Sequence, residues 1–171
     1  MTGVFGKYRG KVINNVDPLN LGRLQISCAA VFGESVLAWA MPCSPYAGYT
    51  PAAGGVGLFL IPPNGSNLWI EFEGGDTEKP IWVGGFWTAG KTPVVPALPT
   101  TKVLKTEGVT IRLDDLPGKG GLTLEVGPPV VAVPVQIALD VTGISISCGS
   151  KVKITLDAAK VTVNDGALEV I

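Results

Sequence analysis

The chain has 171 residues, which is enough for one ordinary domain or for a small domain with an extended appendage. Its formal net charge is -1, with 13 basic and 14 acidic residues spread along the sequence, and this balance argues against a nucleic acid or an anionic membrane surface as a partner. Histidine is absent, which argues against acid–base catalysis near neutral pH and against most transition-metal sites, so we expect no catalytic residue, cofactor or metal.

The three cysteines, Cys28, Cys43 and Cys148, form no paired motif and are odd in number. We therefore expect free thiols that serve as small buried apolar residues, in a protein made in a reducing compartment. The first ten residues lack the charged and then apolar pattern of a signal peptide. The most apolar run, residues 126–135, is too short to span a bilayer and contains three prolines.

Short alternating runs between turn signals fill the first half of the chain, and they predict an all-β fold. With 23 glycines and 14 prolines, the sequence offers many turns and few apolar positions at helical spacing. The expected strands lie within residues 7–15, 22–29, 37–42, 55–63, 67–73 and 80–87. Five or six strands in so short a segment predict a small barrel or sandwich over residues 1–92.

The sequence GFWTAGKT, residues 85–92, matches the spacing of a phosphate-binding loop. A true phosphate loop opens a helix, whose N-terminal N–H groups hold the phosphates. Here the pattern is followed by prolines at 93, 96 and 99, and proline prevents a helix from starting and continuing there. We interpret the pattern as a strand end followed by an extended linker over residues 93–108.

From residue 109 to 171, short strands with strict period-two alternation continue to the end of the sequence. The aliphatic residues of the last four strands are Ile144, Ile146, Val152, Ile154, Leu156, Val161, Val163, Leu168 and Val170. One face of this segment is therefore apolar, and turns such as the one at residues 164–166 are nearly minimal. A single chain would expose that face and its open edges, whereas copies wound around an axis would bury the face and pair the edges. The pattern predicts an intertwined β-prism or β-helix and leaves the number of copies open.

Two motifs in the first half and two stretches in the second carry a family resemblance. The first motif contains Asn15, Asp17, Pro18, Gly22 and Arg23. The second contains Pro63, Gly65, Trp69, Glu71 and Asp76. Together with residues 102–126 and 161–171, they resemble the spike proteins of bacteriophage baseplates, the baseplate assembly protein V family. Its barrel is also found in the valine-glycine repeat spikes of type VI secretion and in extracellular contractile injection particles.

The resemblance implies a non-enzymatic homotrimer, with an N-terminal OB-fold barrel and a C-terminal β-helical needle. It implies a place at the tip of a virion tail baseplate or injection particle, on a hub protein, with transient contact with a target membrane during puncture. Such a chain is made in the bacterial cytoplasm without a signal peptide. Since the sequence ends in Val170 and Ile171 and has no histidine to hold an iron-bound tip, the resemblance also implies a separate tip protein.

The motif residues also have local physical interpretations. Asn15, Asp17 and Pro18 favour an Asx-type turn between the first two strands, and Gly22 favours a tight entry into the second. We expect Arg23 at the barrel rim, within reach of Glu71 or Glu73.

Two other functions remain open from the sequence. One is an oligonucleotide- or carbohydrate-binding OB module that uses Trp69, Trp82 and Trp87. The other is an enzyme, either a nucleotide hydrolase built on residues 85–92 or a glycosidase. The glycosidase would pair carboxylates from Asp17, Glu71, Glu73 and Asp76.

The proline run predicts that the protein does not bind ATP. We expect no heat of ATP binding by calorimetry, and we expect Lys91→Ala and Thr92→Ala to leave assembly unchanged, because no helix N-terminus completes the phosphate site. A micromolar affinity for ATP that Lys91→Ala abolishes would contradict this interpretation.

Overall fold

A computed structural model describes residues 3–34 and 36–170 of the chain. The protein is all-β and divides into two compact units, Met1–Thr88 and Ala89–Ile171. Within the described ranges, no helix has the length and apolar character needed to span a bilayer. The two units are described separately below.

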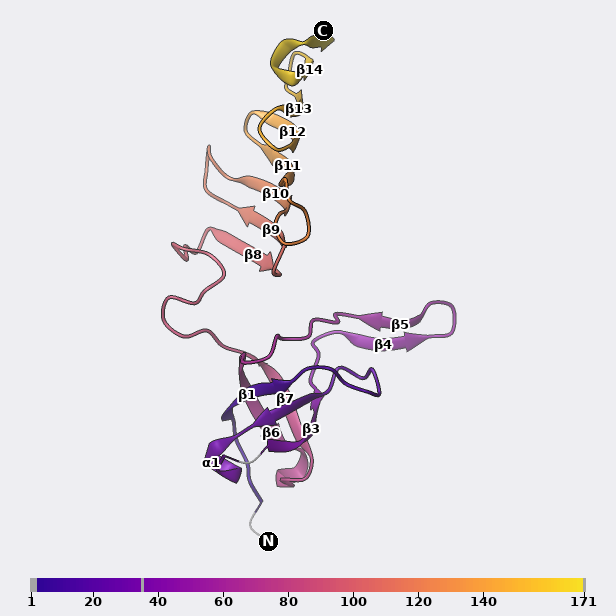
Figure 1. Cartoon of the computed structure of the whole chain (residues 1–171), viewed down its shortest axis with the longest axis vertical. Helices are drawn as coiled ribbons and strands as arrows, with labels where there is room; N and C mark the ends of the chain where they lie inside the picture. Colours follow the sequence, from indigo (N-terminus) through magenta and orange to yellow (C-terminus); the bar gives the residue numbers. More distant parts are fainter. Residues whose placement is uncertain (1–2, 35, 171) are drawn as a thin grey trace. The chain divides into compact units, whose positions relative to one another are not determined.

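The first unit contains a closed five-stranded barrel in the order β1-β2-β3-β7-β6 (Figure 1). Its strands are β1 (Tyr8–Asn14), β2 (Leu24–Ser27), β3 (Val36–Pro42), β6 (Asn67–Phe72) and β7 (Pro80–Gly85). The β3–β7 pair is parallel and closes the barrel, while the other neighbours are antiparallel. A short helix α1 (Ala29–Phe32) and a 3-10 turn η1 (Glu73–Gly75) complete the connections, and the barrel confirms the OB-type fold expected from the sequence.

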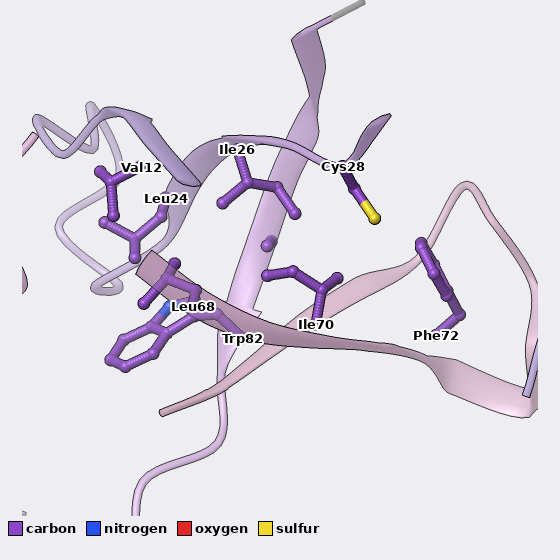
Figure 2. Close-up of a cluster of buried hydrophobic side chains, with 9 residues drawn as sticks. Val12, Leu24, Ile26, Cys28, Leu68, Ile70, Phe72 and Trp82 are labelled. Atoms are coloured by element: carbon purple, nitrogen blue, oxygen red, sulfur yellow. The ribbon is translucent and has the colours of Figure 1, made fainter. Parts of the chain in front are cut away.

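Alternation along the strands builds the barrel core, because every second side chain points inward. In β6, for example, Leu68, Ile70 and Phe72 are buried while the residues between them are half-buried. The core cluster consists of Val12, Leu24, Ile26, Cys28, Ala40, Leu68, Ile70, Phe72 and Trp82 (Figure 2). One chain supplies all of these residues, so the barrel needs no second copy to close its core.

The prediction of a barrel strand over residues 55–63 is wrong. Instead, β4 (Ala47–Thr50) and β5 (Gly54–Gly57) form a separate two-stranded hairpin between β3 and β6. Residues 58–63, which follow β5, have no regular secondary structure. The alternation of small and apolar residues is the same for a free hairpin as for a barrel strand, so sequence pattern did not separate them.

The second unit is an antiparallel meander in which each strand pairs with the next along the chain (Figure 1). The eight strands of its described residues are β8 (Thr101–Lys105), β9 (Val109–Asp114), β10 (Gly121–Val126), β11 (Val135–Asp140), β12 (Gly143–Cys148), β13 (Val152–Leu156), β14 (Val161–Val163) and β15 (Leu168–Val170). The turn η2 (Asn164–Gly166) joins the last two strands, with positive φ at all three residues.

The sheet begins earlier than the sequence suggested. Strand β8 lies inside the segment 93–108 that was interpreted as a linker, and it pairs with β9 from Thr101 to Lys105. Only residues 93–100 of that segment precede the sheet. The prolines correctly indicated the irregular part of the segment. Strand β8 has only five residues, and its apolar alternation is too short to identify a strand without its partner.

The burial of the cysteines also differs from the prediction. Cys28 is buried in the barrel core, whereas Cys43 and Cys148 are exposed in the single chain. Burial raises the pKa of the Cys28 thiol, because the charged form is disfavoured away from water.

Ile70 provides a test of the barrel core. Replacing this fully buried side chain with alanine in Ile70→Ala leaves a cavity, and we expect a loss of about 2–5 kcal/mol in the free energy of unfolding. The matched control Ile13→Ala removes a side chain that is 44 % exposed and should change stability far less. Denaturant unfolding followed by tryptophan fluorescence measures both, and equal losses would contradict this core assignment.

Candidate functional site

The loop between β1 and β2 is organised by a single carboxylate. Asp17 accepts hydrogen bonds from the backbone N–H groups of Leu19 (3.0 Å), Leu21 (2.9 Å) and Arg23 (3.1 Å). The Arg23 guanidinium donates to the same carboxylate, with Nη2 2.7 Å from Oδ1. The Asx-type turn therefore extends into a loop in which one carboxylate holds three N–H groups and a guanidinium.

The expected pairing of Arg23 with Glu71 or Glu73 is wrong. Arg23 binds Asp17, six residues before it, and its guanidinium also lies 5.4 Å from the ring centre of Trp39. Glu71 pairs with Lys7. Arg23 pairs with Asp17 rather than with Glu71 or Glu73 because the Asx turn places the Asp17 carboxylate beside the start of β2.

The two sequence motifs meet in the folded barrel. Asn15 donates from Nδ2 to the carbonyl oxygen of Pro62 (3.0 Å). The carbonyl oxygen of Gly22 accepts a hydrogen bond from Nε1 of Trp82 (3.1 Å). Gly22 has a φ of +76°, and an added Cβ would lie 3.1 Å from the ring of Phe59, so glycine is required on two grounds.

The remaining motif residues occupy turns and the barrel wall. Pro18 lies in the exposed part of the Asp17 loop, and Pro63 accepts a hydrogen bond from the N–H of Ser66. Gly65 adopts a φ of +83° in that same turn. Asp76 accepts from the N–H of Glu78 after the 3-10 turn.

These contacts give no support to paired catalytic carboxylates. A glycosidase acid needs a raised pKa, whereas the Arg23 guanidinium and three N–H donors hold the pKa of Asp17 well below its usual range. Asp76 lies 3.8 Å from Lys79, and Glu71 is held by Lys7. Within residues 3–34 and 36–170, no group of three or more acidic or cysteine side chains could hold a metal ion.

The tryptophans do not form one binding platform. Trp82 belongs to the barrel core, so the expectation that it lies on a binding face is wrong. Trp69 is half-buried, with the Phe86 ring 4.8 Å away and the Arg9 guanidinium 5.6 Å from its ring centre. Trp87 is 67 % exposed.

The phosphate-loop pattern lacks the structure that it needs. Residues 85–92 follow β7 as in a true phosphate loop, but turns and bends, and no helix, follow Lys91 in the described chain up to β8. The Thr92 hydroxyl donates to the carbonyl oxygen of Val94 (3.0 Å), and Lys91 is exposed. The site therefore has no converging N–H groups.

The second unit carries an organised apolar surface. Strand register aligns its aliphatic side chains into continuous rows that run across the sheet. One row is Leu104, Ile111, Leu124, Ile137, Ile146, Ile154, Val163 and Leu168. The next row is Leu113, Leu122, Leu139, Ile144, Leu156, Val161 and Val170. We call the side of the sheet that bears both rows the aliphatic face.

Burial along this sheet is the reverse of the usual pattern. In β12 the aliphatic residues Ile144 and Ile146 are exposed, while Ser145 and Ser147, which alternate with them, are half-buried. Of the nine residues predicted to line an interface between copies, Val161 and Val163 are half-buried and the other seven are between 38 % and 60 % exposed. A soluble chain rarely leaves such a continuous apolar surface uncovered, so the aliphatic face requires a partner.

Comparison with known protein families agrees with both units. Residues 8–87 match the type VI secretion system and phage-baseplate injector OB domain. Residues 101–169 match the phage baseplate V C-terminal trimerisation domain. The chain belongs to the phage baseplate V family. A search of curated proteins finds no match.

For this baseplate V chain, the trimerisation match supports a homotrimer. The family assignment also supports a structural role at a virion tail baseplate. The sequence had identified both parts, but it missed the Asp17–Arg23 pair. The six-residue spacing of an Asx-turn aspartate and an arginine at the next strand start was the available signal.

The Asp17 loop predicts a pH-dependent contribution to stability. Asp17→Asn keeps the shape of the side chain but removes its charge, so we expect a lower unfolding temperature than wild type at pH 7. A carboxyl whose pKa is depressed on folding stabilises the protein above the ordinary value of 3.8 and loses that contribution as the pH falls further.

The difference between wild type and Asp17→Asn should therefore shrink below about pH 4, where the Asp17 carboxyl of the unfolded chain takes up a proton while the same group in the folded barrel stays charged. Thermal unfolding from pH 7 to pH 3 measures this. A difference that stays constant across that range would show that the charge of Asp17 does not stabilise the loop.

Proposed function

We propose that the chain is the central spike of a contractile tail or injection particle. In this proposal, three copies stand at the baseplate tip, bind the hub protein and puncture the envelope of a target cell. The observation that carries the proposal is the aliphatic face, which a single chain leaves exposed and which a family-defined trimerisation domain would cover.

The energetics favour a tightly associated needle. Fully burying an aliphatic side chain contributes about 1.5–3 kcal/mol, so covering one that is still two-fifths exposed contributes roughly 0.6–1.2 kcal/mol. Seven of the predicted interface residues are 38–60 % exposed, and each recurs in three chains. A puncturing device needs this kind of stability, because it must keep its form when force is applied.

The strand lengths support a leading end at β15. Strands β9 to β12 have six residues each, β13 has five, and β14 and β15 have three. A sheet whose strands shorten in this way narrows toward β15. The side chain of Val170 is exposed there, while Ile171 lies outside the described residues. A separate tip protein on this end, and transient contact with the target membrane, fit such a geometry.

The proposal includes no enzymatic step and no nucleic acid partner. The matched families are structural baseplate domains. Of the candidate carboxylates, Asp17, Glu71 and Asp76 each pair with a basic side chain. The phosphate-loop pattern ends in a loop in which the Thr92 hydroxyl bonds to the backbone. The proposed work is mechanical.

Ile154→Asp tests the trimer. Ile154 is 39 % exposed in the single chain, so an aspartate there costs a monomer little, whereas a trimer would bury three unpaired carboxylates at several kcal/mol each. Since 1.4 kcal/mol is tenfold in affinity, we expect the trimer to weaken by at least about a thousandfold. Analytical ultracentrifugation across a dilution series measures this effect.

Ser147→Asp is the matched control. It introduces the same charge on the opposite face of the sheet, beside Lys153 on the neighbouring strand, and should remain trimeric. In particles that depend on a plasmid copy of the spike, Ser147→Asp should restore killing of target cells and Ile154→Asp should not. If Ile154→Asp sediments as a stable trimer, the aliphatic face is not the interface. If it is monomeric but still restores killing, the spike proposal is wrong.

A further inference from the structure

The β4–β5 hairpin, together with its flanks from Cys43 to Ile61, projects from the barrel and is called the arm below (Figure 1). Its two strands pair only with each other in the described chain. All four residues of β4 are exposed, and Tyr49 is 76 % exposed. An isolated two-stranded hairpin is at best marginally stable in water, so the arm needs a surface to lie against.

The arm is also free of charge. Residues 35–70 contain no Asp, Glu, Lys or Arg, although the whole chain has 27 of them, the sum of 13 basic and 14 acidic residues. The nearest charged residues in sequence are Glu34 and Glu71. An exposed segment normally carries charge, which keeps it solvated and apart from other proteins. This one instead combines Tyr46 and Tyr49 with small and aliphatic residues.

An apolar hollow of about 620 Å³ lies at the foot of the arm. Its lining includes Leu21, Pro42, Leu58, Phe59, Leu60 and Trp82, and charged residues are absent from it. Leu21, Leu58, Phe59 and Leu60 are each more than half exposed. The barrel unit thus presents both an apolar projection and an apolar recess.

The foot of the arm is firmly held. The N–H of Leu58 donates to the carbonyl oxygen of Tyr46 (2.8 Å), and the N–H of Cys43 donates to that of Trp82 (2.9 Å). The Ser44 hydroxyl donates to the carbonyl oxygen of Tyr46 (3.0 Å). At Gly57, a Cβ would lie 2.4 Å from that same Tyr46 oxygen, so the two arm strands cross closely where they leave the barrel. The arm is therefore held in place at its foot.

We propose that in the trimer the arm of each copy lies in the apolar hollow of the next copy, with Tyr49 as its main contact. This inference rests on the homotrimer and goes beyond it, because it places a second interface between the barrel units. The contact is head-to-tail, and in a closed ring of three copies every arm and every hollow is used once.

The short segment that joins the barrel unit to β8, called the tether below, explains why a second copy is the favoured occupant of the hollow. Only residues 89–100 lie between the barrel unit and β8, and twelve residues span at most about 40 Å. Once the C-terminal units trimerise, three barrels are confined at an effective concentration that short tethers bring into the millimolar range. A contact too weak to associate free barrels is occupied under those conditions. A neutral arm also avoids the like-charge repulsion that identical charged surfaces would meet.

Photo-crosslinking of the intact chain tests this contact. The photoreactive amino acid p-benzoylphenylalanine replaces Tyr49, and the purified trimer is irradiated without any other protein. We expect crosslinked dimers and trimers that survive full denaturation. Mass spectrometry should place the crosslinks in the segments 19–22, 58–61 and 82–84. The same probe at Glu78, an exposed residue that does not line the hollow, is the control and should crosslink copies far less.

Light scattering on the same samples keeps the two proposals apart. A trimer by light scattering that gives no crosslink between copies from Tyr49 would overturn the arm contact while leaving the spike proposal intact. The probe at Tyr49 could itself disrupt the contact, so the same amino acid is also placed at Ala52, at the tip of the arm. The Ala52 probe should crosslink in the same way. If the purified trimer gives no crosslink between copies but irradiation of the assembled particle joins either probe to another protein, the arm serves that protein and the inference is wrong.

Discussion

The aliphatic face is the constraint on which the rest of this protein depends. In a strand, successive side chains point to opposite sides, and in this meander the register keeps the aliphatic residues other than Val103 and Ala138 on the same side from β8 to β15. The second unit of one chain is a single sheet, and no other described part of that unit packs against its aliphatic face. In the single chain the aliphatic residues of this side are therefore more exposed than the serines and threonines of the other face, and in the proposed trimer other copies would cover them.

The barrel, unlike the second unit, buries its apolar core within one chain. Its sheet closes on itself, so alternate residues of five strands meet inside one chain and bury a complete core. One chain therefore supplies the whole barrel core, and the barrel surface carries loops and an arm. Asp17 stabilises the longest of the loops between paired barrel neighbours, and Trp82 connects that loop to the core through the Gly22 carbonyl group. A self-sufficient unit is thus joined to one that requires copies of itself.

This division assigns different tasks to the two units. Trimerisation in the second unit fixes the stoichiometry and would give the needle its stiffness. The first unit presents three copies of every barrel surface at once, so a weak contact with a hub would gain avidity from the threefold display. The arm and its hollow, in the same way, need only modest affinity, because the tether supplies the concentration.

Much of the fold was predictable from local pattern. Period-two alternation identified the core strands of the barrel and most strands of the second unit, and the glycine at 166 with its neighbours marked the last turn. The predicted interface residues from Ile144 to Val170 do share one face, because alternation by itself fixes the side on which they lie. The prolines after Thr92 argued against a nucleotide site for a reason that is local to the backbone.

What the sequence determined by itself was therefore most of the strands, the apolar face of the second unit and the expectation of more than one copy, since each follows from neighbours along the chain. The tertiary structure decided which segments pair at long range: β3 with β7 to close the barrel, β4 with β5 to leave it as an arm, and β8 with β9 to begin the sheet. It also decided that Arg23 binds Asp17 and that Trp82 is buried. Which strands and side chains pair depends on which groups come together in the folded chain. Alternation is the same in every strand, so it does not indicate the pairing partner.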